Sequence, residues 1–170
     1  MNKITIVLPT LNEEKNVKKV VMEIINKFNF KDYSILFVDD GSTDNTKNEI
    51  IELKKNNLKV DYLFRVDDKD ISRAFIEGIK MIESDYVILM DSDLQHDVSN
   101  LNLLIKYLDT EIEFINGSRF LNQSFIFKDY LYNFGRINMS KLFIYIIKKL
   151  LNVNLTDPLS GFFMIRRDII

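Results

Sequence analysis

The chain has 170 residues, of which 46% are hydrophobic and 28% charged, and its formal net charge at pH 7 is −2. This composition supports one folded domain of ordinary size and excludes an intrinsically disordered or low-complexity chain. The absence of cysteine from the sequence excludes a disulfide framework, a thiolate zinc site and a cysteine nucleophile. The slightly negative charge speaks against a nucleic-acid partner, because nucleic-acid-binding domains are normally basic.

Apolar patterning predicts strands and helices in alternation. The expected strands, which are apolar runs bounded by turn residues, cover 3–8, 34–38, 60–64, 86–90 and 113–116. The expected helices cover 13–28, 71–83, 101–108 and a segment that begins at Ser42 or Thr43 and ends at about 56. Their apolar residues recur at helical spacing. This alternation predicts an α/β fold in which helices cover both faces of a mostly parallel sheet.

The start of the chain and its apolar runs also bear on location. The apolar run before Pro9 is too short for a signal peptide, and no uncharged run reaches the length of about 18 residues that a membrane span needs. A cytoplasmic domain is therefore expected.

Polar residues follow three of the predicted strands, at 9–13, 39–44 and 91–95. The carboxyl ends of parallel strands meet at one edge of a sheet, which is where α/β proteins bind ligands. Carboxylates that converge there repel each other unless a cation or hydrogen-bond donors offset their charge. For Asp44 and Asn45, a structural role in a turn or helix cap is the alternative.

Asp91, Asp93 and Gln95 offer only oxygen ligands, directly after a buried strand. Such donors suit Mg²⁺ or Mn²⁺, and an incomplete shell leaves places for the phosphates of a substrate. His96 is the only histidine and is expected to be a surface or supporting residue rather than part of a zinc site.

Three of these segments resemble the family 2 glycosyltransferases of GT-A fold, which is Rossmann-like. They read Val-Leu-Pro-Thr-Leu-Asn-Glu at 7–13, Val-Asp-Asp-Gly-Ser-Thr-Asp at 38–44 and Asp-Ser-Asp-Leu-Gln-His at 91–96. Gly-Ser-Arg at 117–119 and Asp-Pro-Leu-Ser-Gly-Phe-Phe at 157–163 narrow the resemblance to the dolichyl-phosphate mannosyltransferase branch. The resemblance implies a single GT-A domain over residues 1–170, truncated at its C-terminus relative to the family.

The resemblance also implies roles for individual residues. The residues implied to hold the nucleotide sugar are Pro9, Leu11, Glu13, Val38, Asp40, Asp91 and Ser92, with Asp40 accepting a hydrogen bond from the base. Asp91 and Asp93 are the implied catalytic pair and, with Gln95, the implied metal ligands. Arg119, Arg136 and Ser140 are implied to grip the acceptor phosphate, and the last two share a helix face if that segment is helical.

The activity that the resemblance implies is an inverting, metal-dependent transfer of a sugar to a polyprenyl or dolichyl phosphate. Mannose from GDP-mannose is favoured as the donor, and a UDP-sugar is the alternative. A phosphate acceptor is largely a dianion at neutral pH, so no dedicated general base is expected. A catalytically impaired relative that only binds the nucleotide is a further alternative, because Asp70 stands where the family has glycine. A signalling receiver domain is the alternative from a different class, suggested by the acidic pair Asp39 and Asp40.

Two further segments carry expectations. Residues 125–151 mix aromatic and basic side chains, which suits an amphipathic helix that faces the acceptor or lies peripherally on the cytoplasmic membrane surface. The alternative is a helix packed on the sheet with a solvated lysine edge. Asp97 and Val98 replace prolines of the family, which is expected to alter only the start of a helix.

Overall fold

The computed structural model describes residues 3–56, 59–65, 71–118, 157 and 160–170. The chain forms two compact units, one of Met1–Ile115 with Phe163–Ile170 and one of Asn116–Phe162. The strands are β1 (Ile4–Thr10), β2 (Tyr33–Asp39), β3 (Val60–Phe64), β4 (Tyr86–Leu89), β5 (Phe114–Asn116) and β6 (Phe163–Arg166). The α-helices are α1 (Val17–Lys27), α2 (Thr46–Lys55), α3 (Ile71–Lys80) and α4 (Leu101–Leu104). Short 3₁₀ turns are η1 (Val98–Asn100), η2 (Ile105–Tyr107) and η3 (Arg167–Ile169).

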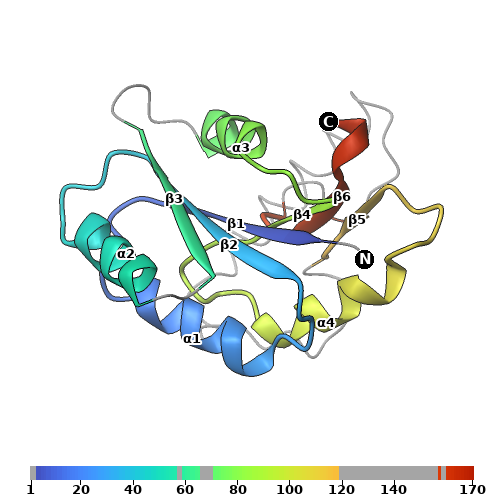
Figure 1. The fold of residues 1–170 in the computed structure, drawn as a ribbon, viewed down its shortest axis with the longest axis horizontal. Coiled ribbons are helices and arrows are strands. Elements are labelled where there is room, and N and C mark those ends of the chain that lie inside the picture. Colours follow the sequence, from blue (N-terminus) through green and yellow to red (C-terminus); the bar gives the residue numbers. More distant parts are fainter. Residues whose placement is uncertain (1–2, 57–58, 66–70, 119–156, 158–159) are drawn as a thin grey trace, which may run out of the picture. The chain divides into compact units, whose positions relative to one another are not determined.

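Within the part of the chain that the structure describes, six strands form one sheet in the order β3-β2-β1-β4-β6-β5 (Figure 1). β1 pairs in parallel with β2 and β4, and β2 pairs in parallel with β3, whereas β6 runs antiparallel to β4. The mostly parallel sheet is thus confirmed. The sequence patterns did not predict β6. The strand order also excludes the receiver domain, whose parallel sheet has the order 2-1-3-4-5.

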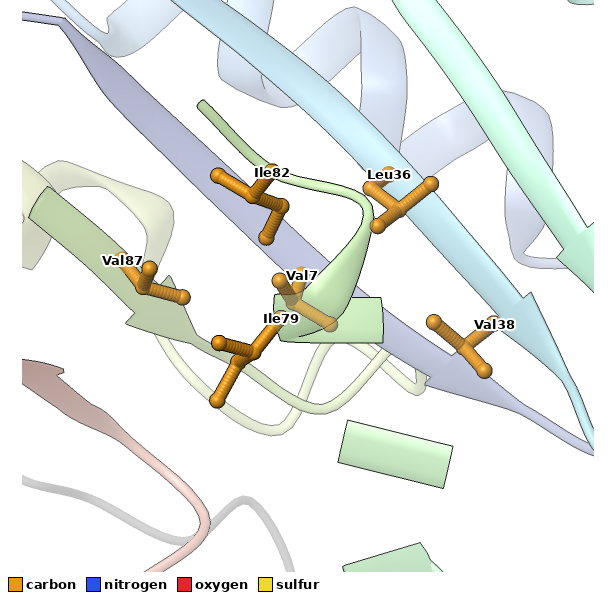
Figure 2. Close-up of a cluster of buried hydrophobic side chains, with 6 residues drawn as sticks. All are labelled: Val7, Leu36, Val38, Ile79, Ile82 and Val87. Atoms are coloured by element: carbon orange, nitrogen blue, oxygen red, sulfur yellow. The ribbon is translucent and has the colours of Figure 1, made fainter. Parts of the chain in front are cut away.

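Helices cover both faces of the sheet, as expected. Figure 1 shows α1, α2 and α4 on one side and α3 on the other. The α1 side is closed by four buried residues at helical spacing: Val17, Val20, Val21 and Ile24. On the α3 side, a buried cluster joins the helix and the turn after it to β1, β2 and β4 (Figure 2). Its members are Val7, Leu36, Val38, Ile79, Ile82 and Val87.

A glycine brings α3 close to this cluster. A Cβ atom added to Gly78 would lie 2.9 Å from Cγ2 of Val38 and 3.5 Å from Cδ2 of Leu36. A larger residue therefore fits only if the helix or the strand moves. The glycine thereby sets the distance between α3 and the end of β2.

Two predicted helices begin later than expected. Residues 14–16 form a turn and α1 begins at Val17, while the backbone N–H groups of Glu13 and Glu14 donate to the side chains of Thr46 and Asp44. The prediction that Ser42 or Thr43 caps the second helix is wrong. Ser42 bonds instead to loop residues, and α2 begins at Thr46.

Other bounds differ by small amounts. The first strand runs past Pro9 to Thr10. Proline has no N–H to donate, but this does not interrupt the strand, because the backbone pairing with β4 has already ended at Val7. The helix expected over 101–108 is a short α4 between 3₁₀ turns. Asp97 begins this segment by accepting a hydrogen bond of 3.0 Å from the N–H of Ser99. The position is thus a helix start, and the effect of the change from proline stays a prediction.

Candidate functional site

The loops after β1 and β2 are joined by hydrogen bonds. The N–H of Asp40 donates to the carbonyl of Thr10 at 2.9 Å. Asn12 has a left-handed backbone, with φ of 57°, and its N–H donates to the hydroxyl of Ser42 at 2.8 Å. Its side-chain oxygen accepts from the N–H of Thr43 at 2.8 Å. Segments thirty residues apart in sequence are thus fixed at one edge of the sheet.

Asp39 is a structural residue of this edge. Its carboxylate is fully buried and accepts the N–H of Ser42 at 3.0 Å as well as the hydroxyl of the same residue. The ammonium group of Lys47 lies 3.8 Å away. These donors offset the charge of Asp39 and hold the turn at Gly41, whose φ of 83° is accessible to glycine without strain.

Asp44 also has a structural role, as its alternative interpretation expected. Its carboxylate accepts the N–H and hydroxyl of Thr46 at 3.0 and 2.5 Å and the N–H of Glu14 at 3.2 Å. Burial raises the pKa of Asp44, but these hydrogen bonds outweigh that effect and leave the pKa below its ordinary value. Asn45 precedes α2 without capping it through its side chain, which bonds to Glu49 and Asn48 instead.

Asp40 is held by an arginine that the sequence interpretation missed. Nη1 of Arg65 contacts Oδ1 of Asp40, and Nε of Arg65 lies 3.0 Å from Oε2 of Glu77 on α3. Only 4% of the Arg65 side chain and 11% of the Asp40 side chain are exposed. Arg65 directly follows β3 at the same sheet edge as the other polar strand ends. A search for polar residues after every parallel strand, and not only for acidic ones, would have found it.

The acid motif after β4 is fixed to β1. The N–H of Met90 donates to the carbonyl of Val7 at 3.1 Å, and the hydroxyl of Ser92 donates to the carbonyl of Pro9 at 3.0 Å. Asp91 and Asp93 flank this buried serine and are both partly exposed. Their carboxylates therefore reach solvent while the backbone between them is held.

Each of the two carboxylates has a neighbour within the motif. Nε2 of His96 lies 3.3 Å from Oδ2 of Asp91, so the histidine supports the motif rather than standing apart from it. Oδ1 of Asp93 accepts the N–H of Gln95 at 2.9 Å, across Leu94, whose φ is 62°. This tight turn exposes the side chain of Gln95 to solvent.

The donor chemistry of the motif fits a hard divalent cation. Within the described residues, no group of three or more His, Cys, Asp or Glu side chains is arranged to hold a metal ion. Asp91, Asp93 and Gln95 carry oxygen donors, the type of ligand that Mg²⁺ and Mn²⁺ take together with water and substrate phosphates. Their role as metal ligands stays a prediction.

The residues implied to hold the nucleoside differ in exposure. Leu11 is 42% exposed, whereas Pro9 and Val38 are buried. The side chain of Val38 faces α3 (Figure 2), so it supports the position of Asp40 and offers a ligand no surface of its own. Glu13 accepts a hydrogen bond of 2.7 Å from the amide of Asn16. The roles of these residues toward a nucleotide stay predictions.

In the second unit, the described residues join two of the motifs. The N–H of Gly117 donates to the carbonyl of Phe162 at 2.8 Å, and the amide of Asn116 donates to the carbonyl of Asp157 at 2.5 Å. A Cβ atom at Gly117 would collide with the ring of Phe162, so glycine is required for this approach. Asp157 is fully buried.

The predicted acceptor side is not tested by the structure. Arg119, Arg136, Ser140, Asp70 and the segment 125–151 lie outside the described residues. Among the helices that are described, none has the length and apolar character needed to cross a membrane.

Comparisons with known proteins agree with the motifs. A model of the family described as Glycosyl transferase family 2 matches residues 5–170. A dolichol-phosphate mannosyltransferase of Pyrococcus furiosus is 29% identical over 99% of this chain and 47% of its own length. A dolichol-phosphate mannosyltransferase of Saccharomyces cerevisiae is 25% identical over 96% of this chain and 60% of its own length. The chain thus spans about half the length of these curated relatives.

Solved structures share the fold. Glucosyl-3-phosphoglycerate synthase from Mycobacterium tuberculosis, in complex with Mn²⁺, UDP and glucosyl-3-phosphoglycerate, has a TM-score of 0.73 and 21% identity over 99% of this chain and 58% of its own. The mannosyltransferase PcManGT from Pyrobaculum calidifontis, in complex with GDP-Man and Mn²⁺, has a TM-score of 0.59 and 15% identity over 69% of this chain and 35% of its own.

At these identities the structural matches show the fold alone, and they confirm the α/β fold of GT-A type. The curated relatives confirm the resemblance to the dolichyl-phosphate mannosyltransferase branch. Because the family model spans nearly the whole sequence, this chain belongs to glycosyl transferase family 2.

Proposed function

We propose that this chain is the GT-A domain of a glycosyltransferase that moves a sugar from a nucleoside diphosphate to a polyprenyl phosphate. One structural observation carries the proposal. Two hydrogen bonds, from Asp40 to Thr10 and from Ser92 to Pro9, bind the acid-bearing ends of β2 and β4 to the end of β1. The names of the relatives from Pyrococcus and Saccharomyces support the lipid-phosphate acceptor.

The two ends of the donor would meet different strands. Asp40 is held by Arg65 and is assigned to the base of the nucleotide. Its N–H bonds to the carbonyl of Thr10, the residue before the exposed Leu11. The partly exposed carboxylates of Asp91 and Asp93 are assigned to the diphosphate end. Carboxylates at that end need a cation between themselves and the phosphates, because they would otherwise repel them.

Asp91, Asp93 and Gln95 would hold this cation, Mg²⁺ or Mn²⁺. When bound, it supplies positive charge for the diphosphate as the glycosidic bond breaks. Ser92 keeps the two aspartates in place through its bond to the carbonyl of Pro9. His96 positions the carboxylate of Asp91.

The reaction needs no protein base. An oxygen of the acceptor phosphate attacks the anomeric carbon, the bond from that carbon to the diphosphate oxygen breaks, and the nucleoside diphosphate leaves with the electron pair. The acceptor is a phosphate monoester whose second pKa is about 6, so it is mostly deprotonated at neutral pH. Attack from the face opposite the leaving group inverts the configuration at the sugar carbon.

The favoured donor is GDP-mannose, and a UDP-sugar is the rival. The mannosyltransferase names of the relatives support the first, whereas the glucosyl-3-phosphoglycerate synthase neighbour was solved with UDP. No described residue distinguishes guanine from uracil. Binding of GDP and UDP, each with and without Mn²⁺, separates the two donors.

The acceptor is assigned to Arg119, Arg136 and Ser140, and the segment 125–151 is proposed to present it at a membrane surface. The planar fork of arginine suits a phosphate, and a lysine keeps the charge but loses the fork. Arg119→Lys and Arg136→Lys are therefore expected to weaken binding of the acceptor and to leave binding of the donor unchanged.

The test is transfer of labelled mannose from GDP-mannose to a polyprenyl phosphate over a range of acceptor concentrations. Transfer that needs a divalent cation supports the proposal. Nucleotide binding without transfer to any lipid phosphate would instead indicate a binding-only relative. A donor-side defect in the two arginine variants would contradict the acceptor assignment.

A further inference from the structure

The guanidinium of Arg65 lies between two carboxylates that come from different layers of the fold. Its backbone N–H donates to the carbonyl of Asp39 at 2.9 Å, which fixes the residue at the end of β2. Its Nη1 contacts Oδ1 of Asp40. Its opposite edge faces α3, with Nε 3.0 Å from Oε2 of Glu77 and Nη2 3.4 Å from Oε1 of the same residue.

This contact with Glu77 uses both carboxylate oxygens. A bidentate pair fixes the plane of a guanidinium as well as its position. Because the plane is fixed, the direction from which Nη1 meets Asp40 is fixed too. The carboxylate of Asp40 is thereby held through its Oδ1 atom.

The backbone beside these residues is held equally closely. Gly78 follows Glu77, and a Cβ atom added to it would lie 2.9 Å from Val38, which stands two residues before Asp40. The packing of α3 on β2 therefore sets the distance that the Glu77 side chain has to span. The three charged residues are thus connected to each other, and the approach of Gly78 to Val38 holds the backbone beside them.

We propose that Glu77 and Arg65 are positioning residues that orient Asp40 toward the base of the donor nucleotide. The inference rests on the proposed function, because it takes from there that Asp40 faces the base. It adds that recognition of the base depends on a residue of α3. Glu77 acts only through Arg65 and has no contact with the ligand in this proposal.

Exposure distinguishes this role from a stabilising one. The side chain of Glu77 is 45% exposed, and an ion pair with an exposed partner contributes little to stability. The other two side chains are nearly buried, so their mutual orientation has few alternatives while Arg65 is held. Loss of the Glu77 charge should thus change the orientation of Arg65. It should have little effect on the free energy of unfolding.

The test compares Glu77→Gln with Glu83→Gln in the purified protein. Glu83 is an exposed glutamate shortly after α3, so both variants lose one negative charge in the same region. Three ligands are titrated in the presence of Mn²⁺: GDP, UDP and pyrophosphate, which has no base. Thermal melting of each variant checks that the fold is kept.

Glu77→Gln is expected to weaken binding of the preferred nucleotide by about three- to tenfold. Binding of pyrophosphate should stay unchanged, and Glu83→Gln should change neither. Glu77→Asp, which keeps the charge, should bind the nucleotide more tightly than Glu77→Gln does. If Glu77→Gln does not fold, Arg65→Lys serves instead, because it keeps the charge and loses the fork, and it should show the same selective loss.

Two outcomes overturn the inference alone: wild-type nucleotide affinity in Glu77→Gln, or an equal loss for nucleotide and pyrophosphate. Failure of the proposed function looks different. In that case the unmodified protein binds neither GDP nor UDP with Mn²⁺, and both proposals are rejected together.

Discussion

The hydroxyl of Ser92 donates a hydrogen bond of 3.0 Å to the carbonyl of Pro9, and both residues are buried. The bond lies just beyond the β1–β4 ladder, which ends at the pair Val7 and Leu89. It extends the connection between the two strands by a side chain after the backbone pairing has stopped. The acid motif is thereby fixed to β1. The other neighbour of β1 in the sheet is β2, which Asp40 directly follows.

Ser92→Ala should lower both stability and metal-dependent nucleotide binding. The carbonyl of Pro9 would lose its buried partner, at a cost of about 1–2 kcal/mol. The flanking aspartates would keep their charges but lose their fixed spacing. Thermal melting and titration of GDP or UDP with Mn²⁺ measure the two effects. A variant with wild-type melting and wild-type affinity would show that the serine is not needed to hold the motif.

Asp93→Asn should remove most Mn²⁺-dependent nucleotide binding and leave the fold intact. Asparagine keeps the oxygen that accepts the N–H of Gln95 but loses the charge that the cation needs. A loss of at least about tenfold in affinity is expected. Asp97→Asn is the matched control, because Asp97 is an exposed cap four residues away and asparagine caps equally well. Equal behaviour of the two variants would contradict the metal assignment.

Asp40→Asn should weaken nucleotide binding and also destabilise the protein. The substitution takes a charged partner from the buried guanidinium of Arg65 and leaves its contact with Glu77 in place. Removing one partner of a buried pair is costly, and about 2 kcal/mol is expected, less than for a wholly unpaired charge. Melting gives the stability change, and titration with pyrophosphate and Mn²⁺ serves as the binding control. An equal loss for pyrophosphate would move Asp40 away from the base.

Much of the fold follows from local sequence patterns. The parallel strands are short apolar runs that end in turn residues, and α1 places its buried residues at helical spacing. These features depend only on neighbours in the chain. β6 does not, because it pairs antiparallel with β4 from more than seventy residues away and follows the segment whose pattern was dominated by aromatic and basic residues. Such pairing is a long-range choice that a local pattern does not contain.

The site was predictable at its acidic residues and less so at their partners. A charge at the end of a buried strand is visible in the sequence, as with Asp40 and Asp91. Its pairing is not, since Arg65 and Glu77 belong to other elements and meet only in the fold. The capping role expected of Ser42 failed for the same reason. Its hydroxyl donates to the carboxylate of Asp39 and accepts the N–H of Asn12, and it does not cap the first turn of the helix.

Gly78→Ala should destabilise the protein, although alanine is the better helix former by about 1 kcal/mol. The added Cβ would lie 2.9 Å from Val38, inside the buried cluster shown in Figure 2. Moving α3 away from the sheet to relieve this contact should cost about 1–3 kcal/mol. The measurement is the free energy of unfolding in urea. A gain in stability would mean that the helix can shift without loss of packing.

The last prediction concerns the pH dependence of stability at Asp44. Burial raises the pKa of this carboxyl, but its hydrogen bonds from Thr46 and Glu14 lower the pKa more, so it lies below the ordinary value of about 3.9 in the unfolded chain. A carboxyl with a lowered pKa in the folded state stabilises the protein fully above the unfolded pKa. That contribution is lost as the pH falls through the folded pKa.

Asp44→Asn should therefore melt at a lower temperature than the unmodified protein at pH 7. The difference should persist to about pH 5 and shrink progressively below about pH 4, where the unmodified carboxyl also becomes protonated. Asp32→Asn provides a control at an exposed aspartate. Melting temperatures at pH 7, 5, 4 and 3 give the comparison. A difference that stays constant down to pH 3 would show that the charge of Asp44 does not stabilise the protein. The protonated carboxyl would then hold Thr46 as well as the carboxylate does.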